Sequence, residues 1–148
     1  YPEELPLPSA GAAELGPSSD TDPVLNAILV LYCAVSLAAV GQGGQATLAF
    51  LEAYWAEHGS LAGRYTLTSG QPVPGFECVA VYGLAARLAR HLGRPGLSDA
   101  FIERMLAYQF LDPVIVRPEG PLPHRRTSPF DNLQAMLALQ QARDGSQP

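Results

Sequence analysis

The apolar and polar positions along the chain predict a series of helices. No charged residue occurs between Pro23 and Leu51, and Val24–Val40 is almost entirely apolar. A helix that is apolar on all sides belongs in a protein core or in a lipid bilayer. We interpret this one as a fully buried helix, because a bilayer-spanning helix needs about 20 apolar residues and this stretch is shorter. A membrane-anchored helix is the alternative.

Start and stop signals place the helix boundaries. Asp22 followed by Pro23 is typical of a helix start, with Asp as the N-cap and Pro at the first helical position. The segment Ser60–Pro74 is not predicted to be helical, because its Tyr and Thr residues favour extended structure. The predicted helices are Pro23–Ala39, Gln45–His58, Gly75–Leu92, Leu97–Gln109 and Pro129–Arg143.

The helices alternate in character. The first, third and fifth are mostly apolar and start after long loops, whereas the second and fourth are amphipathic and follow short turns. This alternation predicts an all-α fold built from an α-hairpin repeat in residues 22–148, with about five helices and an extended arm in residues 1–21. In a ring of such hairpins the apolar helices form the inner layer, and the long loops open on one end where binding groups collect.

Composition adds two constraints. Hydrophobic residues make up 47% of the chain and charged residues only 16%, below the usual share of about 25%. This balance suits a chain that buries more surface than a free monomer of its length needs, so we expect a second chain or a missing half to complete the fold. The 9 basic residues are outnumbered by 14 acidic ones and form no continuous basic stripe, which argues against nucleic acid as a partner.

The sequence offers no cofactor chemistry. Cys33 and Cys78 lie in apolar runs and are interpreted as buried thiols rather than a disulfide or metal pair. No His or Cys residues stand at metal-ligand spacing, and there is no phosphate-binding or dinucleotide-binding motif. We therefore expect neither a metal nor a cofactor.

The order and spacing of three stretches carry a family resemblance: Asn26–Tyr32, Gly70–Phe76 and Ser128–Leu139. They resemble, in turn, three parts of the family 8 glycoside hydrolases, the bacterial endoglucanase group. These parts are the inner helix that carries an Asp-Ala-x-Arg motif with the proposed base, the entry to a later inner helix, and the last inner helix. The resemblance implies the C-terminal half of an (α/α)6 toroid, a β-linked polysaccharide or oligosaccharide of the cellulose type as substrate or ligand, and a secreted or periplasmic location.

The chain departs from that family at the catalytic positions. Asn26 stands where the base Asp is expected and Leu29 where the Arg is expected, and the family's general acid belongs to the N-terminal half. Inverting glycosidases need a carboxylic acid and a carboxylate about 6.5–9.5 Å apart, and an amide cannot take the proton. The resemblance therefore implies that this chain is inactive alone, and that catalysis needs Asp22 or Asp20 as the base and a Glu supplied from elsewhere as the acid.

Six further residues are candidates for substrate contact: Asn26, Arg64, Tyr65, Glu77, Phe130 and Asp131. They include two pairs at loop ends that combine a polar group with an aromatic ring, as sugar sites do. Each also has a structural interpretation: Asn26 as a hydrogen-bonded core amide, Glu77 and Asp131 as first-turn carboxylates that stabilise a helix dipole. A non-enzymatic helical-repeat domain, whose apolar surplus forms a protein interface, is the alternative function.

Overall fold

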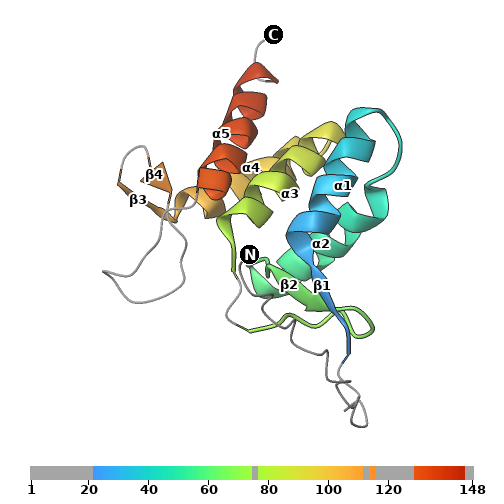
Figure 1. The fold of residues 1–148 in the computed structure, drawn as a ribbon. Coiled ribbons are helices and arrows are strands. Elements are labelled where there is room, and N and C mark those ends of the chain that lie inside the picture. The colour runs from blue at the N-terminus through green and yellow to red at the C-terminus, as the bar shows by residue number, and fades with distance from the viewer. Residues whose placement is uncertain (1–21, 75–76, 112–113, 116–128, 146–148) are drawn as a thin grey trace, which may run out of the picture.

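The computed structural model describes residues 22–74, 77–111, 114–115 and 129–145, and these residues form an all-α fold (Figure 1). Two short antiparallel pairs, β1 with β2 and β3 with β4, accompany the helices. The helices are α1 (Ala27–Ala39), α2 (Gln45–His58), α3 (Val79–His91), α4 (Pro95–Leu106) and α5 (Pro129–Asp144). The strands are β1 (Val24–Asn26), β2 (Arg64–Thr66), β3 (Gln109–Leu111) and β4 (Val114–Ile115). The predicted fold class is confirmed.

Helix α3 is the centre of the fold. It lies between α1 and α5, and α2 and α4 also pack against it (Figure 1). Ten of its thirteen residues are buried, five of them Ala or Gly. A fully buried Leu or Val side chain contributes about 1.5–3 kcal/mol, so this helix holds a large part of the hydrophobic stabilisation. The all-round burial predicted for the first helix is found in α3 instead.

Small residues set how closely the other helices approach α3. A Cβ atom on Gly83 would lie 2.9 Å from the main-chain carbon and oxygen of Gln134 on α5, closer than such atoms can sit. Gly44, which precedes α2, has a φ of +91°, and a Cβ there would lie 2.9 Å from Cδ1 of Leu88. Gly83 therefore allows a main-chain contact between α3 and α5 that any side chain would prevent, and Gly44 supplies the left-handed backbone conformation that precedes α2.

The hairpin connections agree with the sequence pattern. Short turns join α1 to α2 and α3 to α4, and α2 has the predicted bounds. Helix α4 begins at Pro95 rather than Leu97, because Pro is well suited to the first helical turn. It ends at Leu106, before Gln109 enters β3.

The start of the first helix is corrected by the structure. Helix α1 begins at Ala27 rather than Pro23, because residues 24–26 pair with β2 as a strand. The N-cap is Asn26, whose Oδ1 accepts a hydrogen bond from the amide of Ile28 at 3.0 Å. The interpretation of Asp22 as N-cap is therefore wrong, and so is that of Asn26 as a core amide, because Asn26 is exposed.

The burial predicted for this helix is also wrong. One face of α1, with Leu31 and Val35 among its buried residues, packs on α3. The other face exposes Leu29 by 66%, and Cys33, predicted to be buried, is exposed there too. Cys78 is buried as predicted, and both thiols are free. None of the helices in the described residues is long and apolar enough to span a membrane.

The contact between α3 and α5 yields a stability prediction. Gly83→Ala places a methyl group against the main chain of Gln134, so the two helices must move apart. We expect the free energy of unfolding to fall by about 1–3 kcal/mol, the usual cost of overpacking. Urea denaturation followed by circular dichroism measures it.

Gly96→Ala is the matched control. Gly96 lies in the first turn of α4, and a methyl group added there would meet nothing within 4 Å, so this variant should be unchanged or up to about 1 kcal/mol more stable. Equal urea midpoints for Gly83→Ala and the wild type would contradict the proposed close contact.

Candidate functional site

A group of polar side chains gathers around the entry to α3 and the end of α4. It consists of Glu77, Tyr82, Arg104 and Tyr108, which we call the Glu77 cluster. Glu77 lies two residues before α3 begins at Val79, so the prediction that it occupies the first helical turn is wrong. Its carboxylate is held by side chains of α3 and α4 instead.

The Glu77 carboxylate is bound asymmetrically. Nη2 and Nε of Arg104 lie 3.0 Å and 3.2 Å from Oε1, and the Tyr82 hydroxyl donates to the same oxygen. Oε2 receives the longer contact from Nη2, at 3.4 Å, and the side chain of Tyr108 also hydrogen-bonds to this carboxylate. Both charged side chains are partly exposed, Glu77 by 28% and Arg104 by 39%. The exposed part of the Glu77 carboxylate can accept a further hydrogen bond.

Tyr82 connects this cluster to the protein interior. Its hydroxyl accepts a hydrogen bond from the amide of Leu61 at 2.9 Å and donates to Glu77. Burial, together with the neighbouring Glu77 carboxylate, raises the pKa of Tyr82 above its ordinary value of 10, and the same two causes raise the pKa of Tyr108. The guanidinium of Arg104 lies 5.3 Å from the centre of the Tyr108 ring, within range of a cation–π contact.

Asp131 occupies a buried position close by. It lies in the first turn of α5, as predicted, and is completely buried. Its Oδ1 accepts hydrogen bonds from the amide of Ala80 at 3.2 Å and from the thiol of Cys78 at 3.5 Å. Burial and the Asp131 charge raise the pKa of Cys78 to about 11, so the thiol stays protonated as a donor. Asp131 therefore supplies from α5 the acceptor that the N-terminus of α3 needs.

Asp22, a predicted catalytic base, binds a turn. Its Oδ1 accepts from the amide of Thr68 at 2.8 Å, and its Oδ2 accepts from the amide and hydroxyl of Ser69 at 3.0 Å and 3.1 Å. The hydrogen bond from Thr68 is the main cause that lowers the pKa of Asp22. Asp22 thus fastens the segment before β1 to the turn after β2. Asp20 and the predicted arm, residues 1–21, lie outside the described residues.

The other predicted contact residues are dispersed. Arg64 is exposed on β2, and Phe130 is 37% exposed on α5. Tyr65 is buried between the rings of Phe50 and Tyr54, and its hydroxyl accepts from the amide of Ala62 at 2.9 Å. Arg64 and Phe130 therefore lie at the surface, whereas Tyr65 packs in the interior against Phe50 and Tyr54.

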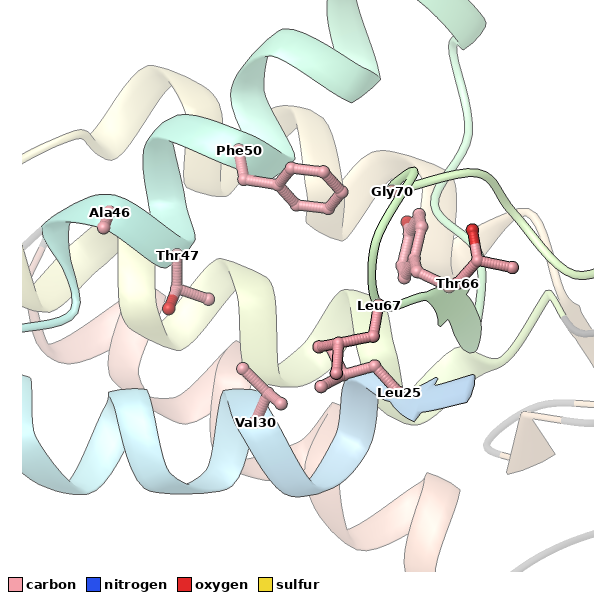
Figure 2. A pocket seen from close by; sticks show the side chains of 9 residues that line it. Leu25, Val30, Ala46, Thr47, Phe50, Thr66, Leu67 and Gly70 are labelled. Carbon is pink, nitrogen blue, oxygen red and sulfur yellow. The ribbon is translucent and has the colours of Figure 1, made fainter. Parts of the chain in front are cut away.

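An apolar hollow opens between α1, α2 and the turn after β2. Its volume is about 320 Å³. Figure 2 shows Leu25, Val30, Phe50 and Leu67 facing it. Val30 also lines a second hollow beside α1, together with Leu29 and Leu37. Such walls fit apolar groups better than the hydroxyls of a sugar.

Sequence reasoning missed three members of the Glu77 cluster: Tyr82, Arg104 and Tyr108. Tyr82 carried a usable signal, because a buried Tyr in an apolar helix needs a partner for its hydroxyl. Arg104 and Tyr108 carried none, since only tertiary packing brings the end of α4 to the start of α3. In the described part of the chain, no group of three or more His, Cys, Asp or Glu residues could hold a metal ion.

Comparison with solved structures shows a fold likeness. A protein described as a novel α-amylase from Clostridium perfringens matches with a TM-score of 0.68 and 20% sequence identity. The match covers 82% of this chain and 37% of that chain, so this chain spans little more than a third of its length. No protein-family model and no curated protein matches the sequence. The fold is therefore similar to part of a glycoside hydrolase, and membership of family 8 stays a prediction.

The buried tyrosines yield a prediction for alkaline solution. Burial raises the pKa of Tyr65 to about 12, and the pKa of Tyr82 is raised as well. The unfolded chain releases these protons near pH 10 while the folded chain retains them, so the free energy of unfolding falls as the pH rises above 10. Denaturant unfolding over a pH series measures the fall, and tyrosinate absorbance follows the titration.

Tyr82→Phe separates this effect from general alkaline damage. At neutral pH it leaves the amide of Leu61 without its acceptor, which costs about 1–3 kcal/mol. Above pH 10 the variant loses stability less steeply than the wild type, because it lacks one phenol whose pKa is raised in the folded state. Parallel curves for the two proteins would show that Tyr82 titrates normally.

Asp22 yields a local prediction. Asp22→Ala removes the acceptor for the amides of Thr68 and Ser69, so their hydrogen exchange speeds up. The amide of Val73, which binds the carbonyl of Arg64 at 2.9 Å, serves as the internal reference. In the wild type the protection fades as the pH falls through the lowered pKa of Asp22. Unchanged exchange at Thr68 and Ser69 in the variant would rule out the fastening role.

Proposed function

We propose that this chain forms part of a glycosidase-like helical toroid and acts on or binds a polysaccharide or oligosaccharide. The observation that carries the proposal is the likeness of 82% of the chain to a solved α-amylase at a TM-score of 0.68. The three sequence stretches that resemble family 8 glycoside hydrolases support the same class of substrate independently. A secreted or periplasmic location belongs to this proposal, since its substrate is an extracellular polymer.

The Glu77 cluster is the sugar contact in this proposal. Oε2 of Glu77 accepts a sugar hydroxyl, and Arg104 donates to a sugar oxygen from its exposed edge. Charged groups that are already paired keep their geometry when a ligand binds, which limits the entropy lost on binding. In this proposal Glu77 accepts hydrogen bonds from the sugar, and the catalytic acid comes from another segment.

The remaining predicted residues fill supporting roles. Asp20 and Asp22 stay the candidate bases, and Asn26, Arg64 and Phe130 stay candidate sugar contacts. Asp131 acts indirectly, because it is buried and holds the start of α3 just after Glu77.

The sequence resemblance favours a β-linked, cellulose-type glucan, and the name of the structural neighbour favours an α-linked one. The experiment therefore includes both.

Titration calorimetry with cellohexaose and maltohexaose tests the binding, and a reducing-sugar assay on carboxymethylcellulose, xylan and starch tests hydrolysis. Glu77→Gln should weaken binding of the better oligosaccharide by roughly tenfold or more, since a hydrogen bond to a charged group is lost. Glu103→Gln is the matched control, because Glu103 is an exposed carboxylate on the same helix as Arg104.

Circular dichroism verifies that both variants are folded. Equal affinity for Glu77→Gln and Glu103→Gln would remove Glu77 from the site. Neither binding nor hydrolysis with any of the five carbohydrates would overturn the proposed function.

A second candidate is a non-enzymatic helical-repeat interaction domain. The exposed apolar side chains of α1 favour it, because monomeric proteins seldom expose large contiguous apolar patches. Leu29, Leu37 and Val40 are 66%, 48% and 69% exposed. A chain that binds no carbohydrate and associates with protein through this face would fit this candidate.

A further inference from the structure

A small hollow between α1 and α3 differs from the two apolar hollows, because a charged side chain lines it. Its volume is about 70 Å³. Its walls come from two helices that pack on each other, and consist of Tyr32, Val35 and Ser36 on α1 and Leu84 and Arg87 on α3. None of these five residues belongs to the Glu77 cluster, so the hollow is a separate feature of the fold.

Arg87 brings a positive charge to this hollow and is held in a defined orientation. Its Nη1 donates to Oε1 of Gln134 on α5 at 2.9 Å, and Gln134 is only 2% exposed. Gln134 is neutral, so this hydrogen bond orients the guanidinium without neutralising its charge. In the described part of the chain, no carboxylate lies within 4.0 Å of Arg87. A charged side chain that is partly buried between helices is usually paired with an opposite charge.

The helices around Arg87 direct their carboxylates elsewhere. Helix α1, which forms the other wall of the hollow, contains no charged residue. On α5, Asp131 accepts from the amide of Ala80 at the start of α3. On α4, Asp99 pairs with Arg90 at 3.0 Å. The charge of Arg87 is therefore available to an anion that enters the hollow.

The rest of the hollow suits an oxyanion. A guanidinium has five N–H donors, and the phenol of Tyr32, which is 53% exposed, can donate one more hydrogen bond. Val35 and Leu84 are 5% and 0% exposed, and apolar walls strengthen the attraction between a cation and an anion beside them. The volume has room for a few water-sized groups and is far below the 300 Å³ or more of an ordinary ligand pocket. It therefore fits one charged group and excludes a sugar ring.

We propose that this hollow binds a single carboxylate or phosphate group of a small molecule, with Arg87 as its counter-ion and Tyr32 as a second donor. The planar fork of an arginine matches two oxygens of either group, and such paired hydrogen bonds are the strong ones. Gln134 is a positioning residue, because it fixes the guanidinium from α5. The site is independent of the carbohydrate contact at the Glu77 cluster.

Two-dimensional NMR of the isotopically labelled protein tests the site. Sodium phosphate and sodium acetate are titrated separately, and sodium chloride keeps the ionic strength constant, since salt screens non-specific attraction. The Nε–H signal of Arg87 and the amide signal of Ser36 should shift in a saturable way with at least one anion. Tighter binding of phosphate assigns the site to a phosphate group, and tighter binding of acetate assigns it to a carboxylate.

Arg87→Gln should weaken binding of the better anion by roughly tenfold or more, because the charge and the fork are both lost. A glutamine can still hydrogen-bond to Gln134, and circular dichroism verifies that the helices are retained. Arg143→Gln is the matched control, because it removes the same charge from an exposed position in the last turn of α5. The affinity of this control should change by about twofold or less, as expected for a distant, screened charge.

Equal weakening by Arg87→Gln and Arg143→Gln would indicate attraction to the overall charge and overturn the proposal. The absence of a saturable shift with both anions would also overturn it. Arg87 would then only join α3 to α5, and Arg87→Gln would change the urea midpoint alone. Carbohydrate binding does not enter any of these outcomes, so this proposal and the proposed function fail separately.

Discussion

The burial of α3 is the constraint on which the rest of the structure depends. Only a helix with small residues on several sides can be covered by four other helices at once, and α3 supplies them at Ala80, Gly83, Ala85, Ala86 and Ala89. The main chain of Gln134 rests where Gly83 has no side chain. Close approach maximises dispersion contacts, so the fold gains stability from tight packing around one element rather than from many salt bridges.

This arrangement determines where polar chemistry can occur. Residues 79–86 of α3 contain no charged side chain. Polar groups therefore lie towards its two ends: Arg87 and Arg90 in its second half, and Glu77, Arg104 and Asp131 at its N-terminal entry. There the same interactions serve two purposes. They satisfy the helix terminus and the buried phenol of Tyr82, and they hold a partly exposed carboxylate in a fixed orientation.

Periodicity predicted the helices well, because each long apolar or amphipathic pattern became a helix. The bounds of α2 and the start of α5 at Pro129 were correct, since local capping signals decide them. The start of α1 was wrong because pairing with β2, more than 35 residues away, overrode the local signal of Asp22 and Pro23. The burial of α1 was wrong because composition does not reveal how many neighbours a helix has.

The site was less predictable for the same reason. Glu77 and Asp131 were recognised as carboxylates near helix starts, but their partners Arg104 and Ala80 come from other elements. Hydrogen bonds between distant segments leave no periodic trace in a sequence. Local patterns therefore identify candidate groups, and only the tertiary fold decides which of them meet.

The cap that Asp131 provides for α3 has a consequence for biosynthesis. Residues 129–144 leave the ribosome after α3, because the helix that needs Asp131 lies some 50 residues earlier in the chain. Until α5 emerges, the central helix lacks the Asp131 carboxylate that accepts from the amide of Ala80, and the main chain of Gln134 that covers Gly83. A nascent chain at that stage leaves its central helix partly uncovered, so the final fold forms only after translation has passed α5.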